Sequence, residues 1–124
     1  MPSPQLDIQS EHVDGVAVVH LNGAIDASSV EDLKRAVEPL CAVPHPKVIL
    51  NCAALVYVNS TGYGLFFTWQ RACRLRNGQM ALCGLKKKIH QVIQVLGLEN
   101  LLTICATQAE AMDLIKQGER RFHE

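Results

Sequence analysis

The sequence lacks both the long apolar stretch of a membrane-spanning helix and the leader of a secreted protein. Its unbroken apolar runs are a few residues long, far short of the ~20 residues that cross a bilayer. The first residues contain no basic segment followed by an apolar one, so we expect no secretory signal. We therefore expect a cytoplasmic protein that does not insert into a membrane.

Cysteine and histidine are present, but neither forms a known metal-binding pattern. The five cysteines lie 10 to 22 residues apart and no C-x-x-C pair occurs. Four of them have apolar neighbours, so we expect buried, reduced thiols. The five histidines are scattered and none falls in H-E-x-x-H. The sequence therefore predicts no metal site.

Acidic residues are absent from the middle of the chain, between residues 39 and 98. That segment holds seven basic residues, whereas residues 1–38 hold seven acids and two bases. The basic middle favours an anionic partner surface; solvation of helix ends is the alternative explanation. Nucleic-acid binding is not expected, because the net charge is zero and aromatic residues make up only 5% of the chain.

Apolar residues recur with strand and helix periods in alternation along the whole chain. The pattern predicts strands at 6–11, 16–21, 47–51, 79–83 and 101–105, and helices at about 30–40, 62–76, 89–96 and 108–117. Val92 and Leu96 are expected on the inward face of the third helix. Gly118 is expected to end the last helix, followed by a polar tail.

The order of these elements, ββαβαβαβα, predicts an α/β fold. Strands joined through helices are parallel neighbours, so we expect a single open, mostly parallel sheet of about five strands. The first strand is expected to be antiparallel, because an Asp-Gly turn at 14–15 joins it to the second. We expect one domain over residues 1–124, with a core from about 6 to 117 and flexible ends.

The sequence contains none of the common catalytic motifs. Neither phosphate-binding glycine motif occurs, and G-x-S-x-G is also absent. Asp26 is the one acid expected near the edge of the sheet where a cleft would form, and a single carboxylate is a poor acid–base site. We therefore expect neither catalysis nor a cofactor.

Hydroxyl residues and glycines are combined in residues 58–64, at the expected start of a helix. Ser60 and Thr61 would lie beside unpaired N–H groups and the positive end of the helix dipole. A phosphate is favoured at such a place, and phosphorylation of a serine there would add about −1.5 to −2 charges. Ordinary capping by Asn59, Ser60 or Thr61 is the commoner explanation of such a string.

Four segments of the chain carry a recognisable pattern. They are Gly23–Asp26, Val48–Asn51 followed by Tyr57–Gly64, Met80–Cys83, and Val92–Leu98. In this order and with these gaps they resemble the anti-sigma-factor antagonists of bacterial partner-switching systems, whose fold is called the STAS domain. The similarity covers roughly residues 6–115.

The resemblance implies a protein that binds an anti-sigma factor with serine kinase activity and is switched off by phosphorylation of Ser60. The partner-binding residues that it implies are Asp26, Asn59, Ser60, Thr61, Gly62, Tyr63 and Gly64. Two positions depart from the family pattern, because Asn59 replaces an aspartate and Tyr63 replaces a leucine.

Two further hypotheses stay open from the sequence. Asn59 and the basic middle segment are also compatible with a constitutive STAS scaffold subunit, such as the cytosolic component of a lipid-transport ATPase complex. A weak homodimer is compatible with a sheet face that no helix covers.

Overall fold

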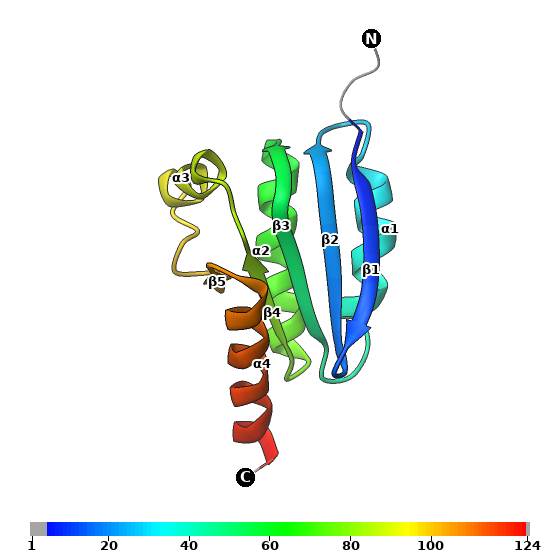
Figure 1. Cartoon of the computed structure of the whole chain (residues 1–124), viewed down its shortest axis with the longest axis vertical. Helices are drawn as coiled ribbons and strands as arrows, with labels where there is room; N and C mark the ends of the chain where they lie inside the picture. Colours follow the sequence, from blue (N-terminus) through cyan, green and yellow to red (C-terminus); the bar gives the residue numbers. More distant parts are fainter. Residues whose placement is uncertain (1–4, 124) are drawn as a thin grey trace.

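The sheet at the centre of the molecule has five strands in the order β1-β2-β3-β4-β5 (Figure 1). The computed structural model describes residues 5–123, with side chains as far as residue 118. The strands are β1 Asp7–Val13, β2 Val16–Ile25, β3 Lys47–Val58, β4 Gln79–Cys83 and β5 Ile104–Cys105. The helices are α1 Val30–Cys41, α2 Ser60–Leu75, α3 Lys87–Val95 and α4 Gln108–His123. β1 is antiparallel to β2 and the other pairs are parallel, so the predicted fold class and element order are confirmed.

The β1–β2 hairpin and β2 itself follow directly from local sequence. Asp14 and Gly15 have φ angles of 52° and 79°, which is the pair of positive values that a type I′ turn requires. Val16–Val19 at the start of β2 are all buried. Burial on both faces of the sheet explains why this strand reads as a continuous apolar run.

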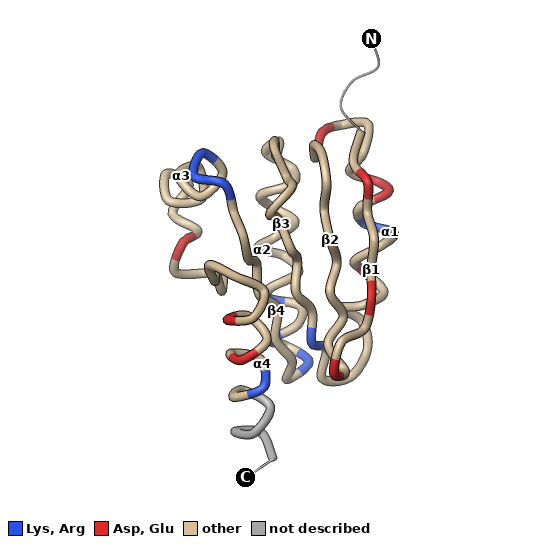
Figure 2. Tube along the Cα trace, in the orientation of Figure 1, with Lys and Arg blue, Asp and Glu red and all other residues tan. Residues whose placement is uncertain are grey.

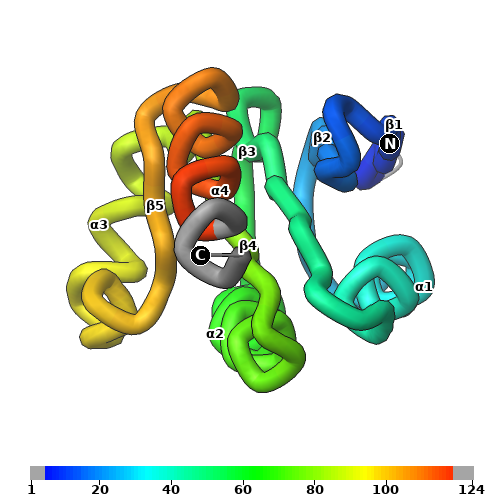
Figure 3. The backbone as a smooth tube through the Cα atoms, turned by 90° about the horizontal axis from the view of Figure 1, so that it is seen from below, coloured from blue at the N-terminus to red at the C-terminus, as the bar shows by residue number. Residues whose placement is uncertain are grey.

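Helices pack on both faces of the sheet (Figure 3). α1, α2 and α3 cover one face and form the larger core with it, in which Trp69 and Phe66 of α2 are the largest fully buried side chains. α4 covers β3, β4 and β5 on the opposite face through Ala111, Met112 and Ile115. The sequence analysis allowed a weak homodimer if one face of the sheet had no helix on it. Both faces carry helices, so this condition is not met.

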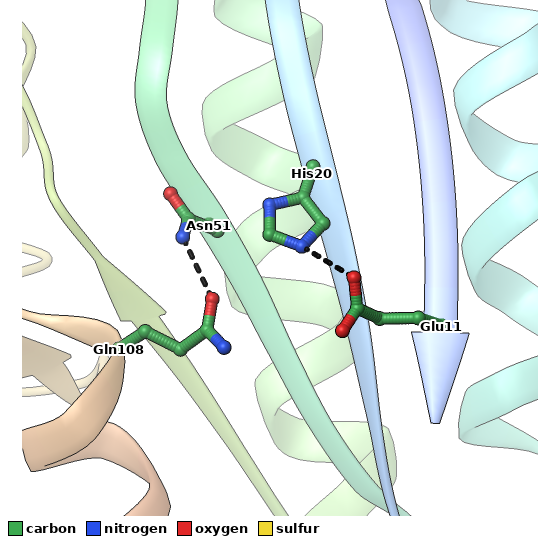
Figure 4. A network of polar contacts seen from close by, with 4 residues as sticks. All are labelled: Glu11, His20, Asn51 and Gln108. Atoms are coloured by element: carbon green, nitrogen blue, oxygen red, sulfur yellow. Dashed lines mark hydrogen bonds and ion pairs between the residues drawn. The ribbon is translucent and has the colours of Figure 1, made fainter. Parts of the chain in front are cut away.

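The part of the second face that α4 leaves open is polar (Figure 4). The ring Nε2 of His20 lies 3.2 Å from Oε2 of Glu11 on the neighbouring strand. Asn51 Nδ2 donates a hydrogen bond of 2.9 Å to Oε1 of Gln108 at the start of α4. These contacts occupy the open region with hydrogen-bonded side chains, and the weak homodimer stays a prediction.

Four of the five strands differ from the sequence prediction. β1 reaches Val13 and β2 continues past Leu21 to Ile25, and β3 and β5 differ most. β3 does not end at Asn51 but continues to Val58, because it stays paired with the end of β2 beyond two shifts in register. β5 is shorter than predicted. The carbonyl of Leu98 accepts hydrogen bonds from the N–H groups of Leu101 and Leu102, so these residues turn before the strand begins.

The last helix was predicted too short. α4 runs through Gly118 to His123, so residues 119–123 continue the helix. A Cβ added to Gly118 would collide with the side chain of Gln79, which donates a hydrogen bond of 2.9 Å to the carbonyl of Ile115. Gly118 thus permits close packing rather than helix termination. Of the flexible ends predicted outside residues 6–117, residues 118–123 belong to α4, and residues 1–4 and 124 lie outside the described residues.

Candidate docking site

α2 begins at Ser60, two residues earlier than the sequence pattern indicated, and Asn59 is its N-cap. Oδ1 of Asn59 accepts a hydrogen bond of 2.8 Å from the backbone N–H of Gly62. The backbone N–H of Asn59 donates to the carbonyl of Ile25 at 2.9 Å, which fixes the helix start to the end of β2. Asparagine and aspartate cap helices about equally well, so Asn59 provides the cap without adding a negative charge.

Ser60 and Thr61 occupy the first two positions of α2, and both are exposed. No acidic residue lies in the first turn of this helix. Both hydroxyl residues therefore meet solvent at the positively polarised end of the helix. A phosphate on either would be favourably placed with respect to the helix dipole and the unpaired N–H groups.

The two glycines that follow have different surroundings. Gly62 is buried, and a Cβ added there would lie 2.7 Å from Cγ1 of Val58 and 2.9 Å from Cγ2 of Ile25. Gly64 is exposed, and an added Cβ would have no neighbour within 4 Å. Gly62 therefore sets how closely α2 approaches the ends of β2 and β3, whereas Gly64 is not required by packing.

Tyr63 packs inward from the first turn of α2. Its side chain is 5% exposed, and its ring meets that of Phe66 edge-on with centroids 6.3 Å apart and an interplanar angle of 88°. Burial raises the pKa of the Tyr63 hydroxyl, so it stays protonated at neutral pH. Tyr63 therefore fills the core position that the family pattern gives to leucine.

Asp26 lies at the same edge of the sheet, directly after β2. Its Oδ1 accepts hydrogen bonds from the hydroxyl and the backbone N–H of Ser28, at 2.6 and 2.9 Å. The hydrogen bond from the Ser28 hydroxyl lowers the pKa of the Asp26 carboxyl, so this group is ionised at neutral pH. Asp26 follows Ile25, whose carbonyl accepts the hydrogen bond from the N–H of Asn59 at the start of α2.

A groove of about 610 Å³ extends from the start of α2 to α3. Four of the predicted partner-binding residues line it: Asn59, Ser60, Tyr63 and Gly64. The other three, Asp26, Thr61 and Gly62, do not. The sequence pattern thus located one end of the groove.

The rest of the groove is formed by residues that the sequence analysis did not assign to a site. Val92 and Leu96 were expected in the core, but they line the groove and are 39% and 52% exposed. Val56 and Tyr57 of β3 line it as well and are 57% and 53% exposed. Helical periodicity could not find this surface, because it predicts an apolar face without showing whether another element covers that face.

Positive charge is concentrated where α3 begins (Figure 2). Lys86 is the N-cap residue, and Lys87 and Lys88 are the first two helical residues. Lys86 Nζ donates a hydrogen bond of 2.9 Å to the carbonyl of Ala53, whereas Lys88 lines the groove. None of the ion pairs between described side chains involves these three lysines.

Other kinds of site were sought in the described part of the chain. No three His, Cys, Asp or Glu side chains come together there to hold a metal ion. Within residues 5–123, no helix has the length and hydropathy that crossing a bilayer requires. All five cysteines are free, and Cys41, Cys52, Cys73 and Cys83 are buried, whereas Cys105, which was also expected to be buried, is partly exposed. Burial raises the pKa of the Cys83 thiol to about 11, which keeps it protonated.

The fold and the position of Ser60 define a class of protein. The STAS domain profile matches residues 7–111, so the chain belongs to the STAS domain family, as its sequence motifs predicted. The anti-sigma F factor antagonist of Paenibacillus polymyxa is 23% identical over 108 residues, which cover 86% of this chain and 92% of that protein.

Solved structures of one relative exist in two states. The unphosphorylated form of the anti-sigma factor antagonist SpoIIAA is 26% identical, with a TM-score of 0.73 over 90% of this chain and 97% of that one. The phosphorylated form of SpoIIAA, a Bacillus cell fate determinant, has a TM-score of 0.67 and 26% identity over 88% of this chain and 99% of that one.

Proposed function

We propose that this protein is a cytoplasmic anti-sigma-factor antagonist that acts by docking rather than by catalysis. It binds an anti-sigma factor with serine kinase activity through the groove beside Ser60, and phosphorylation of Ser60 releases the partner. The observation that carries this proposal is an exposed serine at the first position of α2, at the edge of an apolar groove. The existence of SpoIIAA in phosphorylated and unphosphorylated forms supports it.

The groove explains why a phosphate at Ser60 would act as a switch. Ser60 shares the groove with exposed apolar side chains such as Val92 and Tyr57. A docked partner would exclude water from this surface, and a new negative charge there would then be poorly solvated. The helix itself would tolerate the phosphate, because its N-terminus favours negative charge. Phosphorylation would therefore break the complex without unfolding the protein.

The predicted partner-binding residues take different parts in this proposal. Ser60 and Gly64 provide contact surface at one end of the groove, and Asn59 and Gly62 hold that end in place. Tyr63 forms the floor. Asp26 and Thr61 lie outside the groove and would contact the part of a partner that extends beyond it.

Two substitutions at one position test the switch. Ser60→Ala is expected to keep the affinity for the anti-sigma factor, measured by calorimetry. Ser60→Glu is expected to weaken it about 30-fold or more, as an unpaired charge in an interface would. The control is Thr68→Glu, which places the same charge at an exposed position of α2 that does not line the groove. Equal affinities for Ser60→Ala and Ser60→Glu would contradict the proposal.

Intact-mass analysis of the protein from its native host, followed by mapping of the modified residue, tests the phosphoacceptor directly. We expect one phosphate, on Ser60, and none on the Ser60→Ala variant. A phosphate on Thr61 would transfer the switch to the neighbouring hydroxyl.

The scaffold function remains the second candidate, because Asn59 lacks the negative charge of the family's aspartate. A constitutive subunit would carry no phosphate and would co-purify with a transport ATPase. Its Ser60→Glu variant would bind the partner with the same affinity as the native chain. These three outcomes together would replace the proposed function with this alternative.

A further inference from the structure

The start of α3 has a charge pattern that opposes helix formation. Lys86, Lys87 and Lys88 occupy its N-cap and first two positions, and no acid lies in its first turn. The N-cap side chain also makes no capping hydrogen bond. Cations at the positive end of a helix are unfavourable, and departures from local preference of this kind occur mostly at functional sites. A negative group brought to this place from outside would relieve the repulsion.

The groove extends from the lysine-rich start of α3 to the start of α2. Ser60 and Lys88 both line it, although they belong to different helices. Among the residues with described side chains, no carboxylate lines the groove. The nearest acid beyond α3 along the chain is Glu99, whose Oε1 lies 3.2 Å from Nε2 of His90. The groove therefore offers positive charge beside an apolar surface.

The shape of the apolar surface favours a helix as the occupant. Val92 and Leu96 are four residues apart on α3 and form one wall, while Val56 and Tyr57 form the other. The apolar stripe of an amphipathic helix is wide enough to contact both walls.

An added strand fits the same surface less well. β4 pairs with β3 only as far as Asn51, so the later part of β3 has an edge on that side. Lys86 occupies the start of this edge, because its Nζ binds the carbonyl of Ala53. A lysine placed in this way obstructs the pairing of another strand. The groove is therefore better suited to side-chain contacts than to extension of the sheet.

We propose that the groove binds an amphipathic helix of the protein partner whose apolar stripe is flanked by carboxylates, and that Lys88 pairs with one of those carboxylates. This inference rests on the proposed function and names the chemistry of the partner segment, which that function leaves open. Val92 and Leu96 contact the apolar stripe. Lys88 is the residue that selects an acidic helix over a basic one.

Two matched peptides test this selectivity with the full chain. Both are amphipathic helices of about 18 residues, or five turns, with the same leucine stripe; one carries Glu and the other Lys beside the stripe. Titration is followed by the backbone NMR signals of the protein. The acidic peptide is expected to shift the signals of Tyr57, Val92 and Leu96 and to bind at least about fivefold more tightly than the basic peptide.

The chain provides matched controls for charge and for apolar contact. Lys88→Glu is expected to abolish the preference for the acidic peptide, whereas Lys87→Glu, one residue away and outside the groove lining, keeps it. Val92→Ser is expected to weaken binding of both peptides, whereas Val95→Ser is not, because Val95 is 86% exposed and does not line the groove.

Three outcomes would overturn the inference: equal affinity for the two peptides, shifts confined to another surface, or the same shifts on addition of phosphatidylserine vesicles. The last would identify the groove as a lipid-binding surface. None of these results depends on Ser60, so a failure here is distinguishable from a failure of the phosphorylation tests.

Discussion

The two helices that begin at the groove are built in contrasting ways. α2 starts with a capping hydrogen bond that Asn59 accepts and with a buried glycine, Gly62, packed against the ends of two strands. α3 starts with three lysines and no side-chain cap. The first arrangement fixes the position of Ser60, and the second leaves unfavourable charge at the surface. One helix start is thus optimised for stability and the other, under our proposal, for recognition.

The contrast makes the α2 side sensitive to changes in shape and the α3 side sensitive to changes in charge. The largest effect is expected at Gly62. Gly62→Ala places a methyl group against Val58 and Ile25, and overpacking of this kind lowers the free energy of unfolding by about 1–3 kcal/mol. Urea unfolding, followed by the fluorescence of Trp69, the one tryptophan in the chain, measures this loss.

Gly64→Ala is the matched control for that substitution. It adds the same methyl group two residues later, where the new Cβ would meet no described atom within 4 Å beyond the adjacent residues and the backbone of the helix itself. Replacing glycine by alanine inside a helix is expected to raise the free energy of unfolding by about 0.5–1 kcal/mol. Equal losses for the two variants would show that the start of α2 is not held by close packing at Gly62.

The capping contact of Asn59 gives the next largest effect. Asn59→Ala removes the acceptor for the Gly62 N–H and is expected to lower the free energy of unfolding by about 1 kcal/mol. Asn59→Asp restores the family's residue and should be at least as stable as the native chain, because a carboxylate caps as well and favours the helix dipole. Hydrogen exchange at Gly62 should accelerate in Asn59→Ala alone.

The smallest effects on stability are expected at the start of α3, and they have the opposite sign. Lys87→Glu and Lys88→Glu each replace a cation by an anion at the positive end of the helix, which should raise the free energy of unfolding by about 0.3–1 kcal/mol. Only Lys88→Glu should also lose the preference for an acidic peptide. If Lys88 serves recognition, Lys88→Glu should raise the free energy of unfolding and lose the preference for the acidic peptide. A Lys88→Glu variant with a lower free energy of unfolding and no peptide preference would indicate that Lys88 has a purely structural role.

Much of the framework was predictable because it depends on local chemistry. β4 was predicted with its observed ends, Gln79 and Cys83, since a short apolar strand between turns has few alternatives. The Asp14-Gly15 hairpin followed from its residue types, and Thr107 and Glu110 have the residue types and spacing of a capping box at the start of α4. In α4 the Thr107 hydroxyl accepts from the Glu110 N–H at 3.2 Å, and the Glu110 carboxylate accepts from the N–H of Ala106 at 3.1 Å.

The parts that could not be predicted depend on contacts between distant segments. Val92 and Leu96 have the spacing of a core face, and only the tertiary arrangement shows that no other element covers them. The second half of β3 carries the exposed Ala53 and Ala54, whose side chains give little strand signal, and it is held by pairing with β2. The sequence therefore located Ser60 but not the walls of the groove beside it.

Because Gly62 has no side chain, α2 packs closely against the sheet, and this affects how much conformational entropy each of the two molecules loses on binding. With its helix start fixed in advance, this protein loses little conformational entropy when it presents Ser60. The ordering that complex formation requires then falls mainly on the other molecule. Affinity should accordingly respond strongly to how well the incoming segment is preorganised, and a version of it constrained in its bound shape should dissociate more slowly from an unchanged surface.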